Sequence, residues 1–258
     1  MIRPLCRFAL LGAIAGVMGC ASAPPAVDPA DAIQLSDTQL AANFMTIATR
    51  NEFVSGTHPL VKWREPIRMR VLTDDPHWIE LTARNAVRIQ HLTGHPVGFV
   101  GHNDPSANVT LFSVPFNDAE AFRSALAERG IMEVGQAILR WSHLLGDRDF
   151  CFAGYATDEA GAIASGMIVV SADIDGGILP ACIEEEMVQL MGLPNDNDRV
   201  RPSIFNDDQE FRTMTWHDEL LLQVLYDDRL RIGMSADEAA PLVRQIIAEK
   251  RQAALPAS

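Results

Sequence analysis

Hydrophobic and polar side chains alternate within residues 63–73, where Ile67, Met69 and Val71 are separated by arginines. Successive side chains of a β-strand point to opposite faces of a sheet, so this period of two predicts a half-buried strand. Apolar runs bounded by turn residues predict three more strands, at residues 109–114, 150–156 and 167–172.

A helix is predicted to follow the first strand. Asp75 and Pro76 form its start signal, because proline fits the first turn of a helix, and Gly94 is its stop signal. We expect its apolar side to carry Ile79, Ala83, Ala86 and Val87. Other helices are expected from Ser36, which forms a capping-box pattern with Gln39, and over residues 118–129, 133–145, 180–191, 215–226 and 235–252.

This order of elements predicts one α+β domain over residues 32–258. We expect a small mixed sheet, a central helix at residues 180–191, and a mostly helical carboxyl-terminal part. No internal repeat interrupts this plan.

The amino terminus has the pattern of an export signal. Arg3 and Arg7 precede an apolar run over residues 8–18, which is too short to span a bilayer as a helix. The run ends in Val-Met-Gly-Cys20, which resembles a bacterial lipobox. We therefore predict a signal peptide at residues 1–19, lipid on Cys20 and a proline-rich tether at residues 20–31. The alternative is an ordinary secretory signal with an unrelated cysteine.

By resemblance to known lipoprotein sorting, Ala21 after the cysteine favours the outer membrane. The protein is then expected in the cell envelope, facing the periplasm and bound to the membrane through the lipid on Cys20. Cys6 would leave with the signal peptide, so Cys151 and Cys182 would remain in an oxidising compartment. We predict a disulfide between them, the alternative being two buried thiols that do not meet.

Charge limits the classes of partner. The 258 residues include 21 basic and 34 acidic ones, a net charge of −13, and losing Arg3 and Arg7 leaves 19 against 34, or −15. Such a surface would repel nucleic-acid phosphates and provides no general basic patch for anionic lipid. An envelope protein or a peptide remains a possible partner. No cofactor is expected, since no glycine-rich phosphate loop or metal-type cysteine cluster occurs.

The most informative segment is the central helix and the loop that follows it. At 3.6 residues per turn, one side of the helix carries Ile183, Met187, Leu190 and Met191, which we expect to pack under the sheet. The opposite arc carries Cys182, Glu185, Glu186 and Gln189.

This arc is similar to the zinc-peptidase helix His-Glu-x-x-His-x-x-Gly, in which two imidazoles bind zinc and the glutamate acts on bound water. Glu186 and Gly192 are in place, but Glu185 and Gln189 replace the imidazoles, and Asn195 stands where a third histidine would be. Because a neutral amide is a poor zinc ligand, we expect a zincin-like architecture and no metal site.

The same segment carries a resemblance to a family. The chain contains Cys-Ile-Glu-Glu-Glu-x-x-Gln-x-x-Gly-Leu-Pro-Asn-Asp, then Ser-Ile-Phe-Asn-Asp, then Asp-Glu-Leu-Leu-Leu and Leu-Tyr-Asp-x-Arg-Leu-x-x-Gly-Met. Over residues 50–250 these motifs resemble the bacterial domain of unknown function 2927 (DUF2927), except that Asp228 replaces an expected proline. The resemblance implies a Glu-Glu-x-x-Gln signature at Glu185, Glu186 and Gln189 and a paired Cys151 and Cys182, but no assigned activity.

Two functions are therefore open. One is a non-catalytic binding or scaffold protein, in which Glu185, Glu186 and Gln189 belong to a polar network. The other is a hydrolase acting on a periplasmic peptide or cell-wall target, with Glu186 as the base and Glu185 and Gln189 orienting the reactants. A catalyst needs these side chains in an open cleft, whereas a structural network would be buried and hydrogen-bonded within itself.

Three weaker candidates have simpler interpretations. The Asn- and Asp-rich residues 195–198 and 206–208 could bind calcium, but turn chemistry explains them equally well. His91 and His95 could bind a metal, but Gly94 between them favours a helix end. His217 and Asp218 could be a base and its orienting group, but a polar pair in a first helical turn is the simpler interpretation.

Overall fold

The computed structural model describes residues 35–51, 56–73, 75–114, 120, 124, 151–206 and 211–254. The predicted signal peptide, Cys20 and the tether at residues 20–31 lie outside them. The predicted helices at 118–129 and 133–145 also lie outside, except for Glu120 and Ser124, which are both helical.

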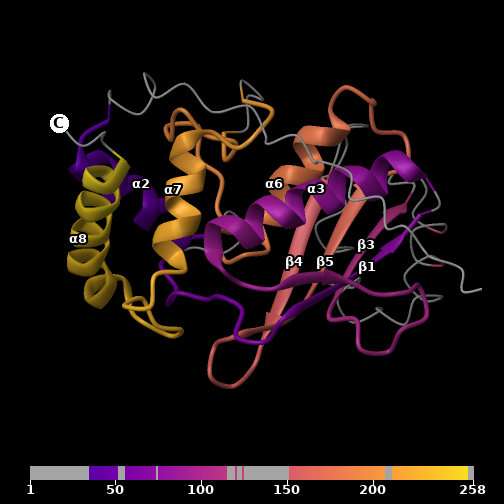
Figure 1. The fold of residues 1–258 in the computed structure, drawn as a ribbon, viewed down its shortest axis with the longest axis horizontal. Helices are drawn as coiled ribbons and strands as arrows, with labels where there is room; N and C mark the ends of the chain where they lie inside the picture. Colours follow the sequence, from indigo (N-terminus) through magenta and orange to yellow (C-terminus); the bar gives the residue numbers. More distant parts are fainter. Residues whose placement is uncertain are drawn as a thin grey trace, which may run out of the picture.

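Within these residues, the structure contains five helices and a five-stranded sheet (Figure 1). The helices are α2 (Asp37–Ala48), α3 (Pro76–Thr93), α6 (Leu179–Gln189), α7 (Trp216–Leu225) and α8 (Ala236–Ala254). The strands are β1 (Ile67–Leu72), β2 (Val97–Phe99), β3 (Val109–Val114), β4 (Cys151–Thr157) and β5 (Ile163–Ser171).

The sheet is mixed, with the strand order β2-β1-β3-β5-β4. Strand β1 pairs parallel with β2 and β3, and β3 pairs parallel with β5. The edge strand β4 is antiparallel to β5, to which a short turn connects it. The predicted α+β fold, with its small mixed sheet, central helix and helical carboxyl-terminal part, is confirmed.

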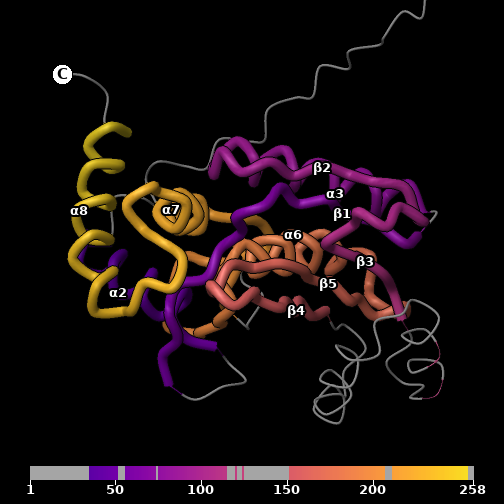
Figure 2. The backbone as a smooth tube through the Cα atoms, turned by 90° about the horizontal axis from the view of Figure 1, so that it is seen from below, coloured from indigo at the N-terminus to yellow at the C-terminus, as the bar shows by residue number. Residues whose placement is uncertain are grey.

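The two faces of the sheet differ in what covers them. Ile67, Met69 and Val71 of β1 are buried in the main core, as the alternation predicted. This face packs against α3 and α6, which also contact each other (Figure 2). Arg68 and Arg70 alternate with these residues and therefore lie on the opposite face.

Helix α3 begins and ends where the sequence predicts. The Asp75 side chain accepts a hydrogen bond from the His77 amide at 2.9 Å, Pro76 occupies the first turn, and Gly94 is left-handed at φ 69°. Of the predicted apolar side, however, only Ala86 is buried. Ile79 and Val87 are 44% and 69% exposed, and the buried side instead carries Trp78, Leu81, Thr82, Asn85, Ala86 and Ile89. The larger Trp78, Leu81 and Ile89 bury more apolar area than the alanines of the predicted side, so they face the sheet.

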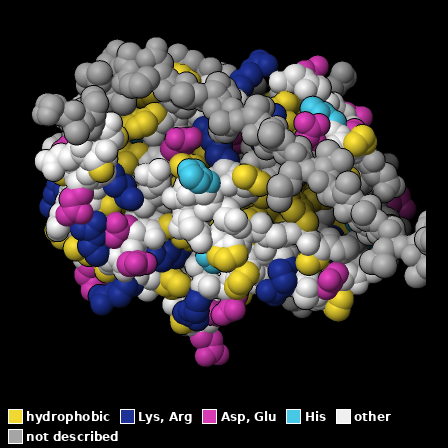
Figure 3. Space-filling view, in the orientation of Figure 1, with side chains coloured by type: hydrophobic (Ala, Val, Ile, Leu, Met, Phe, Trp, Pro, Cys, Tyr) yellow, Lys and Arg dark blue, Asp and Glu magenta, His cyan; other side chains and the backbone are white. Residues whose placement is uncertain are grey.

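Helices α2, α7 and α8 pack together beyond the end of the sheet, at the left of Figure 1. The Ser36–Gln39 capping box at the start of α2 is confirmed. Arg251 of α8 bonds Asp37 of α2 at 2.6 Å. Acidic and basic side chains are interspersed around α8 on the face drawn in Figure 3, so the acidic residues form no single-sign patch on that face.

Three strands differ from the sequence prediction. Strand β1 begins at Ile67, four residues after the start of the predicted span 63–73. Strand β2 was missed because it has three residues, too few to show a period of two. Strand β5 begins four residues before the predicted start, at Ile163, because Ser165 and Gly166 interrupt its apolar pattern. The helices α6, α7 and α8 agree with their predicted spans to within two residues at each end.

Candidate functional site

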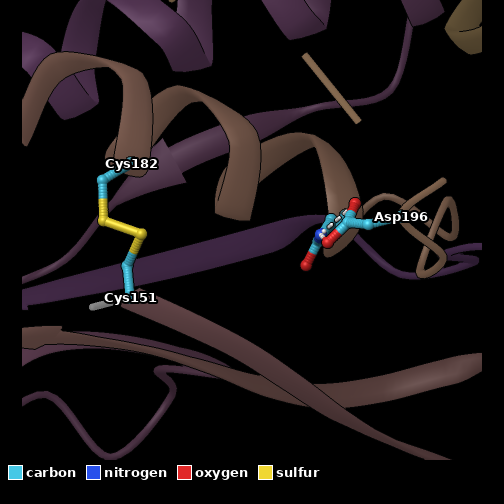
Figure 4. The surroundings of a disulfide bond; sticks show 4 residues. Cys151, Cys182 and Asp196 are labelled. Atoms are coloured by element: carbon cyan, nitrogen blue, oxygen red, sulfur yellow. Dashed lines mark hydrogen bonds between the residues drawn. A yellow bond between two sulfur atoms is a disulfide. The ribbon is translucent and has the colours of Figure 1, made fainter. Parts of the chain in front are cut away.

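Helix α6 lies between α3 and the edge strand β4. Cys182 in its second turn is bonded to Cys151 at the start of β4, with the two Cα atoms 5.9 Å apart (Figure 4). The predicted disulfide is thereby confirmed. The arc of α6 that carries Cys182 therefore faces the edge strand, where the sequence placed only the apolar side under the sheet.

Both arcs of α6 are buried. The expected apolar residues Ile183, Met187, Leu190 and Met191 are at most 2% exposed. On the other arc, Glu186 is 5% and Gln189 is 7% exposed, while Glu185 is half-buried. A helix surrounded in this way belongs to the interior of a domain.

Gln189 is held by the loop that follows the helix. Its Nε2 donates to Oδ1 and Oδ2 of Asp196, both at 2.9 Å. Figure 4 shows Asp196 beside the carboxyl-terminal end of α6, opposite the disulfide end. The next residue in the frame, Asn195, is 6% exposed and donates from Nδ2 to the Thr46 carbonyl of α2 at 3.1 Å. The amide side chains at these two positions thus join three segments of the chain.

A glycine allows the loop after α6 to fold back so that Asp196 reaches Gln189. Gly192 has φ 109°, and a Cβ placed on it would lie 2.2 Å from the Val61 carbonyl oxygen. The carbonyl groups at the helix end are satisfied by other elements: Trp63 Nε1 donates to the Leu190 oxygen at 2.8 Å, and Tyr226 Oη donates to the Met191 oxygen at 3.0 Å. Helix α6 ends at Gln189 with Leu190 as its cap, so the predicted span to Met191 was two residues too long and Gly192 follows the helix end by three residues.

The strongest ionic contact of α6 involves Glu184, which the sequence analysis did not single out. Glu184 Oε1 lies 2.7 Å from Arg88 Nη1 of α3 and accepts from the Met214 amide at 2.8 Å. Arg88 also bonds Glu219 of α7 at 2.7 Å. Burial raises the pKa of the Glu184 carboxyl, and the Met214 amide and Arg88 lower it by less. Because Glu184 and Arg88 are far apart in the sequence, no local sequence pattern could predict their contact.

A second buried network surrounds Asp218 at the start of α7. Its carboxylate accepts from Ser203 Oγ at 2.5 Å, from the Ile204 amide at 3.1 Å and from the Thr215 amide at 2.8 Å. His217 is fully buried, with Nδ1 3.3 Å from Asp218 and Nε2 3.0 Å from Asn43 Nδ2. Because Asn43 Nδ2 is a donor, this assignment makes Nε2 the acceptor and places the ring proton on Nδ1. The pair thus connects α7 to α2 in the interior, without contact to solvent.

The remaining candidate residues from the sequence form hydrogen bonds that stabilise nearby backbone. Asn197 accepts from the Arg199 amide at 3.0 Å, and Asn206 Nδ2 donates to the Asp198 carbonyl at 3.3 Å, as in ordinary turns. Residues 207 and 208 lie outside the described chain. His95 Nε2 lies 3.0 Å from the Glu65 carbonyl, and its ring contacts Tyr226. Within the described residues, no three His, Cys, Asp or Glu side chains are grouped as a metal site requires.

A cleft of about 180 Å³ lies elsewhere, at the β3-β5-β4 side of the sheet. Its lining residues are Arg70, Ala107, Asn108, Thr110, Gly154, Tyr155, Ala156, Ser165, Gly166 and Met167. None of the α6 residues Glu185, Glu186 and Gln189 lines it. Its base is formed by the sheet face that turns away from α3 and α6.

The family model described as "Protein of unknown function (DUF2927)" matches residues 37–245 of the 258. The chain belongs to this family. The DUF2927 match begins with α2 and ends within α8, so it includes α6, the disulfide, both buried networks and the cleft. No curated protein matches the chain. Across the part of this DUF2927 protein that the structure describes, every helix is too short or too polar to cross a bilayer.

Proposed function

We propose that this protein is a non-catalytic, lipid-anchored envelope protein that binds or scaffolds a partner on a zincin-like frame. The observation that carries the proposal is the contact of Gln189 with Asp196. Gln189 stands where a zinc peptidase has an imidazole, and its amide nitrogen has no lone pair free for a metal. In this protein that nitrogen is buried and bonded to a carboxylate.

The other two positions of the frame support the same function. Asn195, in place of a third imidazole, uses its amide to hold α2. Glu185 is half-buried on α6, and a carboxylate alone beside two committed amides is a weak donor set for a transition metal. We infer that the polar residues of α6 stabilise the domain. They do not bind a metal, as histidines at these positions would.

The order of the elements supports a zincin-like frame. A mixed sheet whose single antiparallel strand lies at its edge is followed by a helix with the Glu-x-x-Gln-x-x-Gly pattern. Gly192 then has a positive φ, and the chain after it returns to α6, where Asp196 bonds Gln189. The frame is retained, and the residues that differ are those which would bind the metal.

Two features support the envelope location. The sequence has an export signal followed by Cys20, and a disulfide occurs in the folded domain, as is typical of oxidising compartments. Ser36 lies sixteen positions after Cys20, and a fully extended chain of that length reaches roughly 55 Å. A tether of that length lets the domain meet partners some distance from the membrane.

Metal analysis and a hydrolysis assay test the absence of catalysis. Full-length protein purified in detergent should contain no stoichiometric zinc, and any hydrolysis of peptide or cell-wall substrates by the preparation should be the same for wild type and Glu186→Gln. Stoichiometric zinc that is lost on Gln189→Ala, or hydrolysis that disappears in Glu186→Gln, would overturn the proposal and favour the hydrolase.

Mass spectrometry of the membrane-bound protein tests the anchor. The mature chain should begin at Cys20 and carry acyl groups, and Cys20→Ser should release the protein from the membrane fraction. A matched Cys6→Ser variant should leave anchoring unchanged. An unmodified Cys20 in the mature protein would contradict this part of the proposal.

A further inference from the structure

The cleft is built on one row of the sheet. Arg70 of β1 is opposite Thr110 of β3, Thr110 is opposite Met167 of β5, and Met167 is opposite Gly154 of β4. Paired residues of neighbouring strands point to the same face, so the row crosses four strands on the side away from α6. Gly154 has no side chain to occupy its end of the row.

Arg70 has hydrogen bonds but no counter-charge among the residues that the structure describes. Its Nη2 donates to Thr110 Oγ1 at 3.0 Å and its Nη1 donates to the His102 carbonyl at 3.4 Å. Its Nε is buried without an acceptor. By contrast, Arg64, Arg88, Arg229 and Arg251 each form an ion pair with a carboxylate. Arg70 forms none with any described residue, although acidic side chains outnumber basic ones in the chain.

A half-buried guanidinium without a counter-ion is energetically unfavourable, because burial weakens its hydration and no carboxylate compensates. An unsatisfied buried donor in a native protein requires an explanation, because buried polar groups are normally satisfied, and a bound ion is one such explanation. The site here is concave, so an anion that enters the cleft can approach Arg70 directly.

The other residues that line the cleft indicate which chemical groups the bound anion has. Thr110 accepts from Arg70 and keeps its own hydroxyl proton as a donor, and the exposed Ser165 provides a second hydroxyl. The Met167 side chain and the methyl groups of Ala107 and Ala156 make the rest of the wall apolar. One cation, two hydroxyls and an apolar wall in a small volume fit a monoanion with a short apolar substituent.

We propose that this cleft binds a small carboxylate, at the carboxyl terminus of a peptide or on a free organic acid, through the Arg70 guanidinium. Arginine suits this role because its planar donors match the two oxygens of a carboxylate. The inference deepens the proposed binding role by naming a ligand class, and it does not depend on the residues of α6.

Calorimetric titration of the full-length protein in detergent tests the proposal. The probes are N-acetyl-alanine, its neutral amide, butyrate, and tri-alanine with a free or an amidated carboxyl terminus. The free acids should bind at least tenfold more tightly than the amides. Stronger binding of tri-alanine than of butyrate would assign a peptide terminus, and the reverse order would assign a free acid.

Matched variants locate the site. Arg70→Met should weaken binding of the free acids at least tenfold, and Thr110→Val should weaken it a few-fold. Arg68→Met is the control, because Arg68 has the same charge on the same strand face but does not line the cleft. It should change affinity less than twofold. If Arg70→Met does not fold, Arg70→Lys provides the test, since a lysine keeps the charge but loses the paired donors, and binding should still weaken several-fold.

Equal binding of acid and amide, or unchanged affinity in the Arg70 variants, would overturn the proposal. Tighter binding of inorganic phosphate than of every carboxylate would also overturn it, by assigning another class of anion. Failure here is distinguishable from failure of the proposed function. Hydrolysis that is lost in Glu186→Gln would refute the non-catalytic role whatever the cleft binds, whereas absence of carboxylate binding would refute the cleft alone.

Discussion

Arg88 of α3 and Glu184 of α6 form a buried ion pair, with Nη1 and Oε1 2.7 Å apart and their side chains 14% and 4% exposed. Through Glu219 the same guanidinium also holds α7. Three helices that are distant in the sequence therefore share one charged contact.

Removing Arg88 should destabilise the domain strongly. Arg88→Met leaves the Glu184 carboxylate buried without its partner, and a loss of about 3 kcal/mol in the free energy of unfolding is expected. Arg84→Met is the control, since Arg84 is exposed one turn earlier on α3, and it should cost less than about 0.5 kcal/mol. Urea denaturation measures both. Equal costs for the two variants would contradict a specific role for the Arg88–Glu184 pair.

Glu184 should make stability depend on pH. Burial raises its pKa above the ordinary 4.5, so the folded protein binds the proton more tightly than the unfolded chain. Its contribution to stability is then fully present below pH 4.5 and is lost as the pH rises through the raised pKa.

Glu184→Gln cannot titrate, and so it isolates this effect. The free energy of unfolding of wild type minus that of Glu184→Gln should fall as the pH rises from 4.5. Urea denaturation at a series of pH values measures the difference, with the exposed Glu80→Gln as a control. A difference that stays constant or grows with pH would show that Arg88, not burial, dominates the environment of Glu184.

The disulfide should contribute substantially to stability. Cys151 and Cys182 are 31 residues apart, and closing a loop of this length is worth about 3–4 kcal/mol on the chain-entropy model. The double variant Cys151→Ala/Cys182→Ala should unfold at a correspondingly lower urea concentration. Reductant should lower the midpoint of the wild type and leave that of the double variant unchanged. Reductant-insensitive unfolding of the wild type would refute a stabilising bridge.

Two glycines with positive φ should respond differently to substitution. Gly94→Ala places a methyl group in open space and should cost about 1 kcal/mol, the price of a left-handed alanine. Gly192→Ala adds a clash with the Val61 carbonyl and should cost about 3 kcal/mol or more. Thermal unfolding by circular dichroism compares them. Similar melting temperatures would mean that the Val61 segment moves aside easily.

Local signals in the sequence predicted most of the fold. The ends of α3 followed from Asp75, Pro76 and Gly94, because capping depends on residues close together in the chain. The buried face of α3 did not follow, since Trp78 and Ile89 outweigh the predicted apolar side only once the sheet is present. Strand β2 was too short to show any period.

The candidate site was predicted only in part. The sequence placed Glu186 and Gln189 together on one arc of α6, and Asp196 could have been found as the partner of Gln189, because Gly192 turns the chain back between them. Glu184 was missed because Arg88 precedes it by 96 residues. The cleft was missed because Arg70 and Thr110 meet only through strand pairing.

The disulfide between Cys151 and Cys182 closes β4, β5 and the start of α6 into one covalent ring. The turn from Asp158 to Ala160 is an exposed part of that ring, where a protease can reach the chain. A single cut there opens the ring without dividing the molecule, so the nicked protein keeps its full mass until the bridge is reduced. Until then, neither half of the nicked chain is released from the other.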